Sequence, residues 1–162
     1  MTLLANKEGL DLTGLARDIA DAYKAGLGAD VESASIVTRE SKFSVEETVA
    51  RLEARLAALK IPVFATFDHA DNAQKVGLEL RPTKVIVFGN PQVGTRLMQD
   101  RQTIALDLPL RLSVWEDARK RVWVSYPSVG DLAGQYGIKD KAVVSAMERL
   151  LDGLAARSTD VY

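Results

Sequence analysis

The chain of 162 residues contains no cysteine and a single histidine, His69. Without cysteine, the chain forms no disulfide, thiolate zinc site or iron–sulfur cluster, and it has no cysteine nucleophile. One histidine also excludes any site within a single chain that needs two imidazole groups. These absences leave little room for catalysis, and they bound the function more firmly than any motif that is present.

A strong net charge is also lacking, because 21 Lys and Arg side chains oppose 22 Asp and Glu side chains, which leaves −1 at pH 7. Nucleic-acid coats and polybasic membrane anchors depend on a large positive charge. We therefore expect neither nucleic acid nor a membrane as a partner. The chain has 162 residues, of which 47% are hydrophobic, so it can bury the core of one domain.

Long apolar runs are missing as well. The segment Met1–Glu8 has no basic region followed by the roughly 7–15 apolar residues of a secretory signal. No stretch approaches the roughly 20 apolar residues of a membrane-spanning helix. The sequence therefore predicts a cytoplasmic protein.

Charge is distributed unevenly along the chain. Residues 1–40 hold four basic and seven acidic groups, a net of −3, whereas residues 41–162 hold 17 basic and 15 acidic groups, a net of +2. We interpret residues 1–33 as an N-terminal leader or extension and residues 34–162 as a single domain. In the leader, apolar residues from Leu12 to Tyr23 at steps of three and four predict a short helix capped by Asp11.

The clearest local pattern lies at residues 44–60. Ser44 and Glu47 form a capping box, in which the serine accepts from the backbone of Glu47 and the carboxylate reaches back. The apolar residues behind the box recur at steps of four and three: Val45, Val49, Leu52, Leu56 and Leu59. This spacing predicts an amphipathic helix.

The remaining patterns predict a mixture of strands and helices. Strands are expected at residues 34–40, 61–67 and 85–88, the last without alternation and so buried on both faces. A short helix is expected before the third of these strands and another after Asn90. Residues 108–126 alternate as a hairpin, and Asp140 can cap a final helix. The predicted class is α+β, a mostly antiparallel or mixed sheet of about five strands with helices packed on one face.

A candidate binding segment runs from Gly89 to Thr95, where a strand leads through a glycine turn into a helix. A helix N-terminus presents backbone N–H groups that can hold an anion or a small ligand. The expected contact residues are Gly89, Asn90, Gln92, Val93 and Thr95. A P-loop would need lysine where Thr95 stands, so nucleotide hydrolysis is not expected. The competing interpretation is a capped turn without a ligand.

His69 follows Asp68 at the end of an expected strand, a common place for functional residues. An imidazole can act as a general base, which makes an enzyme using His69 with Asp68 or Asp107 near the Gly89–Thr95 turn one hypothesis. A metal or haem site with His69 and Met98 as ligands is another, although no diagnostic spacing supports it. The alternative is a surface or helix-capping histidine. No metal site is predicted, and any cofactor stays unspecified.

Asp107 lies within the apolar passage Ile104–Leu110. A carboxylate in such surroundings is either buried and perturbed, or it caps the start of a strand. Arg111, four residues further on, is its nearest cation.

Two tryptophans give a sharper prediction. If the hairpin turn has three or five residues, Trp115 lies directly opposite Trp123 on the face of the sheet away from the core. Such a pair forms an apolar patch that needs a cover. The cover could be a second subunit, residues 11–27 or a ligand, and we favour an interface that includes Trp115, Trp123 and Arg111.

Several short motifs occur together in this chain: Phe88-Gly89-Asn90-Pro91, Ile104-Ala105-Leu106-Asp107-Leu108-Pro109-Leu110, Val114-Trp115-Glu116, Ile61-Pro62-Val63-Phe64 and Asp68-His69-Ala70. With the helix start at Ser44, this combination resembles the bacterial and archaeal domain-of-unknown-function family 302 over roughly residues 34–155. The resemblance implies a compact α+β domain that tends to form homodimers, and it implies no activity.

The sequence therefore favours a homodimer that binds a small ligand or a protein partner rather than catalysing a reaction. The enzyme hypothesis, with His69 and a carboxylate, requires these side chains to converge in one pocket. The metal or haem hypothesis requires His69 and Met98 to lie together.

Overall fold

The computed structural model describes residues 12–22 and 35–161. The chain forms two compact units, Met1–Ser33 and Ala34–Tyr162. The first contains helix α1, Leu12–Ala22, as the apolar spacing predicts. The predicted cap Asp11 and the predicted last apolar residue Tyr23 lie outside the described residues.

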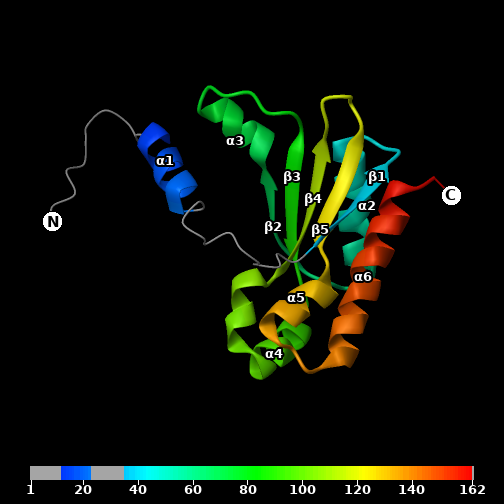
Figure 1. Ribbon diagram of the computed structural model, residues 1–162. Coiled ribbons are helices and arrows are strands. Elements are labelled where there is room, and N and C mark those ends of the chain that lie inside the picture. Colours follow the sequence, from blue (N-terminus) through cyan, green and yellow to red (C-terminus); the bar gives the residue numbers. More distant parts are fainter. Residues whose placement is uncertain (1–11, 23–34, 162) are drawn as a thin grey trace. The chain divides into compact units, whose positions relative to one another are not determined.

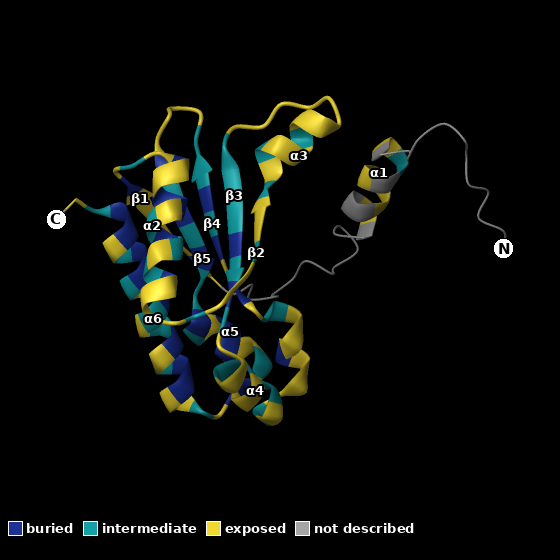
Figure 2. Ribbon diagram, turned by 180° about the vertical axis from the view of Figure 1, so that it is seen from behind, coloured by how far each residue is buried: buried dark blue, intermediate teal, exposed yellow. Residues whose placement is uncertain are grey.

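The second unit is built on a sheet of five antiparallel strands in the order β1-β5-β4-β3-β2 (Figure 1). The strands are β1 (Ile36–Ser41), β2 (Val63–Asp68), β3 (Thr83–Phe88), β4 (Leu110–Glu116) and β5 (Val122–Pro127). Helices α2 (Val45–Ala58) and α6 (Lys141–Thr159) pack against one face of this sheet (Figure 2). The predicted α+β class is confirmed.

The two long helices begin at the capping residues that the sequence indicates. Ser44 Oγ accepts from the Glu47 N–H at 3.1 Å, and Asp140 Oδ1 accepts from the Val143 N–H at 3.1 Å. The capping box is only half formed, because the Glu47 carboxylate accepts from Arg51 Nε at 3.3 Å instead of reaching back to Ser44. An ion pair one turn along the helix replaces the second bond of the box.

The core lies between the two helices and the inner face of the sheet. Leu52 and Leu56 of α2 are fully buried, as are Ile86, Leu112 and Val124 of the three central strands (Figure 2). The residues between them along each strand point to the opposite face of the sheet. Within residues 35–161, no helix packs over that opposite face.

One expectation about β3 is wrong. Residues 85–88 were expected to be buried on both faces, but Val85 and Val87 are only half-buried, whereas Ile86 and Phe88 are fully buried. Only Ile86 and Phe88 point toward the helices, so the apolar run reflects a core on one side and a partly open apolar face on the other.

Four shorter helices complete the unit. Helices α3 (His69–Lys75) and α4 (Pro91–Asp100) occupy the two places where short helices are expected. Two elements were not expected: the 3₁₀ helix η2 (Gln102–Asp107) and helix α5 (Val129–Tyr136), which packs against α6. Both are short, and α5 contains Gly130 and Gly134, so neither shows a strong helical pattern in the sequence.

None of the helices in the described part of the chain is long and apolar enough to span a membrane.

Two leucines of α2 test this arrangement. Leu52 is completely buried, whereas Leu59, just after the helix, is 54% exposed. We expect Leu52→Ala to lower the free energy of unfolding by about 2–5 kcal/mol, because it leaves a cavity in the core. The matched variant Leu59→Ala should change it by less than about 0.5 kcal/mol. Urea unfolding followed by tryptophan fluorescence measures both, and equal losses would contradict the assigned core.

Candidate functional site

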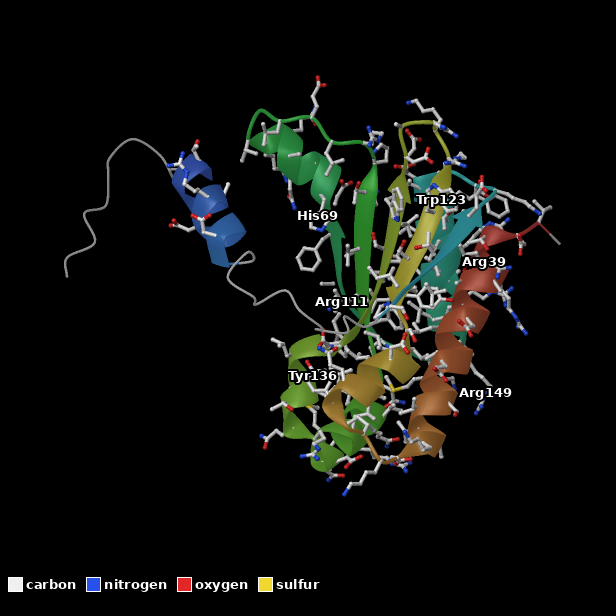
Figure 3. All side chains as sticks on the ribbon, viewed as in Figure 1. Arg39, His69, Arg111, Trp123, Tyr136 and Arg149 are labelled. Atoms are coloured by element: carbon white, nitrogen blue, oxygen red, sulfur yellow. The ribbon has the colours of Figure 1, made fainter. Side chains whose placement is uncertain are left out.

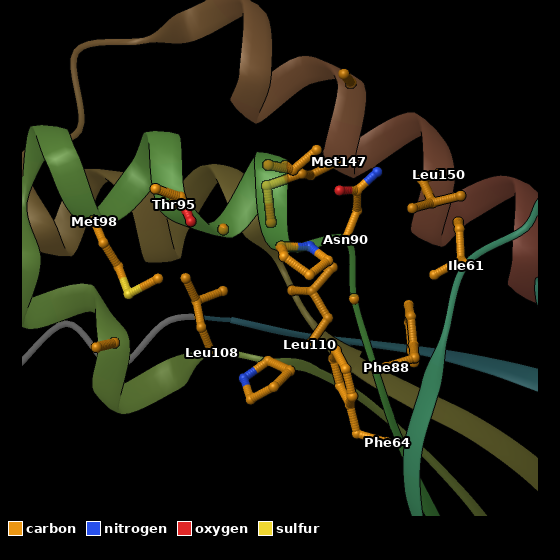
Figure 4. Close-up of a pocket in the computed structure, with 17 residues that line it drawn as sticks. Ile61, Phe64, Phe88, Asn90, Thr95, Met98, Leu108, Leu110, Met147 and Leu150 are labelled. Carbon is orange, nitrogen blue, oxygen red and sulfur yellow. The ribbon is translucent and has the colours of Figure 1, made fainter.

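A cavity of about 410 Å³ lies at the end of the sheet where β3 stops and β4 begins (Figure 4). Its walls come from β2 and β3, helix α4, the segment leading into β4, and helix α6. The large apolar side chains that line it are Ile61, Phe64, Phe88, Val93, Met98, Leu108, Leu110, Met147 and Leu150. Asn90 and Thr95 contribute the polar side chains of the lining. No charged side chain is among the described residues that line it.

The turn after β3 closes one wall of the cavity. A Cβ atom placed on Gly89 would lie 3.6 Å from Pro109 Cβ and 3.7 Å from Phe64 Cε2, so these two rings pack against bare backbone. The Leu108–Pro109 peptide bond is cis. The Gly-Asn-Pro and Leu-Pro-Leu motifs, which lie far apart in the sequence, therefore face each other across one wall.

At the N-terminus of α4, where the sequence suggests an anion or ligand site, the first backbone N–H groups are engaged within the turn. Asn90 Oδ1 accepts from the Gln92 N–H at 2.9 Å, and the Asn90 carbonyl accepts from the Val93 and Gly94 N–H groups at 3.1 and 3.0 Å. Pro91 has no N–H group to contribute. The first backbone donors of the helix are thus already used within the turn, and apart from the side chains of Asn90 and Thr95 the surface that faces the cavity is apolar.

Most of the predicted ligand-contacting residues do lie at this cavity. Gly89, Asn90, Val93 and Thr95 line it, whereas Gln92 does not. Sequence reasoning missed the wall formed by Met147 and Leu150 of α6. Their helical spacing predicts a buried face, but only the packing of α6 shows that part of this face borders a cavity.

The proposed acid and base occupy the opposite end of the sheet. Asp68 is the last residue of β2 and caps α3 by accepting from the Asp71 N–H at 2.9 Å. That backbone hydrogen bond, together with Lys84 at 3.5 Å, holds the pKa of the Asp68 carboxyl below its usual range. His69 is the first residue of α3, and its ring stacks on Phe67 with 6.5 Å between ring centroids (Figure 3). The helix cap is therefore the aspartate and not the histidine.

The strand register explains why these groups do not converge on the Gly89–Thr95 turn. Asp68 pairs with Lys84, and Gly89 lies five residues further along the chain than Lys84. At about 3.4 Å per residue, this separation is roughly 17 Å. Asp68 instead borders a separate polar depression of about 750 Å³ with Lys84 and Glu116. His69 and Asp68 therefore do not converge in a pocket at this turn, which the enzyme hypothesis requires.

Asp107 lies nearer to the cavity, but its carboxylate is engaged elsewhere. It accepts from Tyr136 Oη at 2.5 Å, and Arg111 lies 3.4 Å away, as the sequence suggests (Figure 3). The hydrogen bond to Asp107 raises the pKa of the Tyr136 hydroxyl. Asp107 ends η2 and holds α5 near the start of β4, so its position indicates a structural role.

The two ligands of the metal or haem hypothesis, His69 and Met98, do not lie together within one chain. Met98 lines the cavity, whereas His69 stacks on Phe67 at the far end of β2. Across residues 12–22 and 35–161, no group of three or more His, Asp or Glu side chains is arranged to hold a metal ion.

The predicted tryptophan pair is confirmed. Trp115 and Trp123 are directly opposite each other in the β4–β5 register, with ring centroids 6.2 Å apart. The Asp117 N–H donates to the Arg121 carbonyl at 2.8 Å, so three residues form the turn, and Lys120 among them has a positive φ of 66°. Both rings are half-buried on the face of the sheet away from α2 and α6.

Hydrogen bonds fix the two indoles. Trp115 Nε1 donates to Ser125 Oγ at 2.9 Å, and Trp123 Nε1 donates to Asp117 Oδ2 at 3.0 Å. Partial desolvation acts to raise the pKa of Asp117. The bonds from Trp123 and from the backbone and side chain of Arg121 outweigh it and hold that pKa well below its usual range. The ionised carboxylate is thus favoured in the folded protein.

This carboxylate gives a pH-dependent prediction. A folded-state pKa below the unfolded one contributes stability above about pH 4, and this stability is lost as the pH falls toward the folded pKa. We expect Asp117→Asn to lower the urea midpoint at pH 7, and the difference from wild type to shrink as the pH falls below about 4. Exposed Glu79→Gln is the control. A difference that stays constant between pH 7 and pH 3 would contradict this role.

Comparison with known proteins reveals relatives of most of the chain. It is 41% identical over 121 residues to a protein of Brucella suis biovar 1 (strain 1330) named Fluoride-specific ion channel FluC 1, covering 74% of this chain and 48% of that protein. A protein of the same name from Brucella abortus biovar 1 (strain 9-941) is also 41% identical, with 45% of its length covered. The chain therefore spans less than half the length of these curated relatives.

A solved structure has the same fold. The crystal structure of the uncharacterized conserved protein DUF302 from Bacillus stearothermophilus superposes with a TM-score of 0.68 at 23% identity, covering 76% of this chain and 97% of that one. The family model described as Domain of unknown function DUF302 matches residues 37–154, close to the range of the resemblance seen in the sequence. The match to the family model, together with the fold and the motifs, shows that the chain belongs to the DUF302 family.

Proposed function

We propose that this domain binds a small apolar molecule in the cavity beneath the Gly89–Asn90–Pro91 turn and catalyses no reaction on it. The observation that carries the proposal is the cavity itself, about 410 Å³ in volume and lined largely by apolar side chains. Binding sites for small molecules are typically concave, mainly apolar and about 300–1,000 Å³ in volume. We keep the cytoplasm as the proposed compartment, which the absence of cysteine supports.

The side chains of the wall support binding rather than catalysis. Met98 and Met147 both line the cavity, and methionine adapts its shape to varied apolar ligands. The described residues of the lining include no carboxylate, imidazole or lysine that could act as an acid or base.

Filling the cavity tests this function. A Cβ atom on Gly94 would lie 3.9 Å from Leu108 Cδ1 and 4.0 Å from Met98 Cε, so a larger side chain there enters the space between two lining residues. We expect Gly94→Leu to weaken binding of the neutral fluorescent probe N-phenyl-1-naphthylamine by about tenfold or more. The measurement is a fluorescence titration of wild type and variant.

Gly134→Leu is the matched control. Both glycines lie within helices, and a Cβ atom on Gly134 would meet nothing within 4 Å, away from the cavity. Replacing a helical glycine favours the helix by up to about 1 kcal/mol, so neither variant should unfold more readily than wild type. If Gly94→Leu binds the probe as tightly as wild type does, the proposed binding site is contradicted.

We also propose that the protein is a homodimer that uses the open face of its sheet. The face away from α2 and α6 carries the half-buried Trp115, Trp123, Val85 and Val87, with the exposed Arg111 beside them. Ser113 and Ser125 lie on the same face, and partly exposed apolar and aromatic side chains that are spread over several adjacent strands are characteristic of a protein interface. The alternative cover, residues 11–27, includes residues outside the described part of the chain and stays a prediction.

A charge placed on this face tests the dimer. Val85 lies in the middle of β3, opposite Ser113 of β4 and Phe67 of β2. We expect Val85→Arg to convert a wild-type dimer into a monomer at micromolar concentration in sedimentation velocity, because two like charges would meet near the interface. Leu59→Arg, at an exposed site after α2, should leave the dimer intact. A monomeric wild type would refute the dimer.

A further inference from the structure

The capping residue of α4 has a chemical group that capping does not need. Asn90 Oδ1 accepts from the Gln92 N–H, which fixes the orientation of the amide and turns its Nδ2 the other way. Asn90 is exposed, and none of the described residues accepts a hydrogen bond from that Nδ2 group. Asn90 lines the cavity, among Met147 and Leu150 of α6 in Figure 4.

The other caps of this domain show what the amide adds. Ser44, Asp68, Ser128 and Asp140 cap their helices with a hydroxyl or carboxylate oxygen, and each accepts from a backbone N–H two or three residues into the helix. An oxygen is sufficient for an N-cap. Asn90 alone among these capping side chains brings two additional N–H donors, and it brings them to the wall of an apolar cavity.

An apolar ligand entering the cavity would displace the water that hydrates these donors. A polar group that loses water without gaining a partner opposes binding, so the favoured ligand offers an acceptor at this point. A carboxylate would also be an acceptor, but the described lining contains no cation to compensate its desolvation. These two constraints leave a neutral acceptor on an otherwise hydrophobic molecule.

We propose, on the basis of the binding function above, that the ligand is a neutral hydrophobic compound with a carbonyl group, whose oxygen accepts from Asn90 Nδ2. The hydrocarbon part lies against the large apolar side chains of α4, α6 and the segment before β4. The amide selects among hydrophobic molecules, and the apolar wall supplies most of the affinity.

A pair of isosteric probes tests this selection. Acetophenone and α-methylstyrene have the same shape, but the first has a carbonyl oxygen where the second has a methylene group. Each is titrated against N-phenyl-1-naphthylamine bound to wild type, to Asn90→Asp and to Asn90→Ser. Both variants keep a capping oxygen, so their melting temperatures should stay near that of wild type. Asn90→Asp removes the donor and adds a charge, whereas Asn90→Ser removes the amide without adding one.

We expect both variants to weaken the binding of acetophenone by about tenfold relative to that of α-methylstyrene, which corresponds to the loss of one hydrogen bond to the ligand's carbonyl oxygen. If both compounds displace the fluorescent probe and their affinity ratio is the same in wild type and variants, the carbonyl assignment is overturned and the binding function stands. If wild type does not bind the fluorescent probe, the binding function fails and the carbonyl assignment fails with it.

Discussion

The structure depends on a sheet that buries only one of its faces beneath two helices. Alternate residues of the central strands, such as Ile86, Leu112 and Val124, enter the core against α2 and α6, and their neighbours face the other way. Because side chains alternate along a strand, each gain in burial on one face leaves an equal row of residues on the other. The open face with its tryptophan pair is therefore a direct consequence of how the core is made.

The same two-layer arrangement produces the cavity. Helix α6 has 19 residues and spans about 28 Å, whereas the strands, with six or seven residues, span about 20–24 Å. The C-terminal end of α6 is held at the end of β1, where the Lys42 N–H donates to the Thr159 carbonyl at 3.0 Å and Arg39 contacts Thr159 Oγ1 at 3.0 Å. The additional length thus projects past the opposite end of the sheet (Figure 1).

Short elements close the space under this projecting part of α6. Helix α4, η2 and the turn at Gly89 surround it, and Tyr136 of α5 is tied to Asp107 at the end of η2. The resulting cavity is mostly apolar, with one amide at its wall, which suits the proposed binding of a ligand better than catalysis. The single histidine of the chain lies at the other end of the sheet.

Local signals in the sequence were sufficient to predict the five strands, the helices other than η2 and α5, and the facing pair of indoles. Ser44, Asn90 and Asp140 begin helices because a capping side chain satisfies backbone donors within three residues of itself. Trp115 faces Trp123 because the number of residues in the hairpin turn decides which residues of the two strands lie opposite each other, and an odd number pairs these two. Such features depend on neighbours in the chain, so one sequence is enough to predict them.

Which residues share a site was decided by the tertiary structure. Asp68 ends β2 and Gly89 follows the adjacent strand β3, yet the antiparallel register places them at opposite ends of the sheet, and no local pattern reports that register. Met147 and Leu150 border the cavity because α6 is longer than the strands beneath it. The sequence alone determined the starts of helices α2, α4 and α6, the pairing of the two tryptophans across the hairpin, and the exclusion of cysteine chemistry. Strand register and helix overhang, which are long-range properties of packing, decided which residues line the cavity.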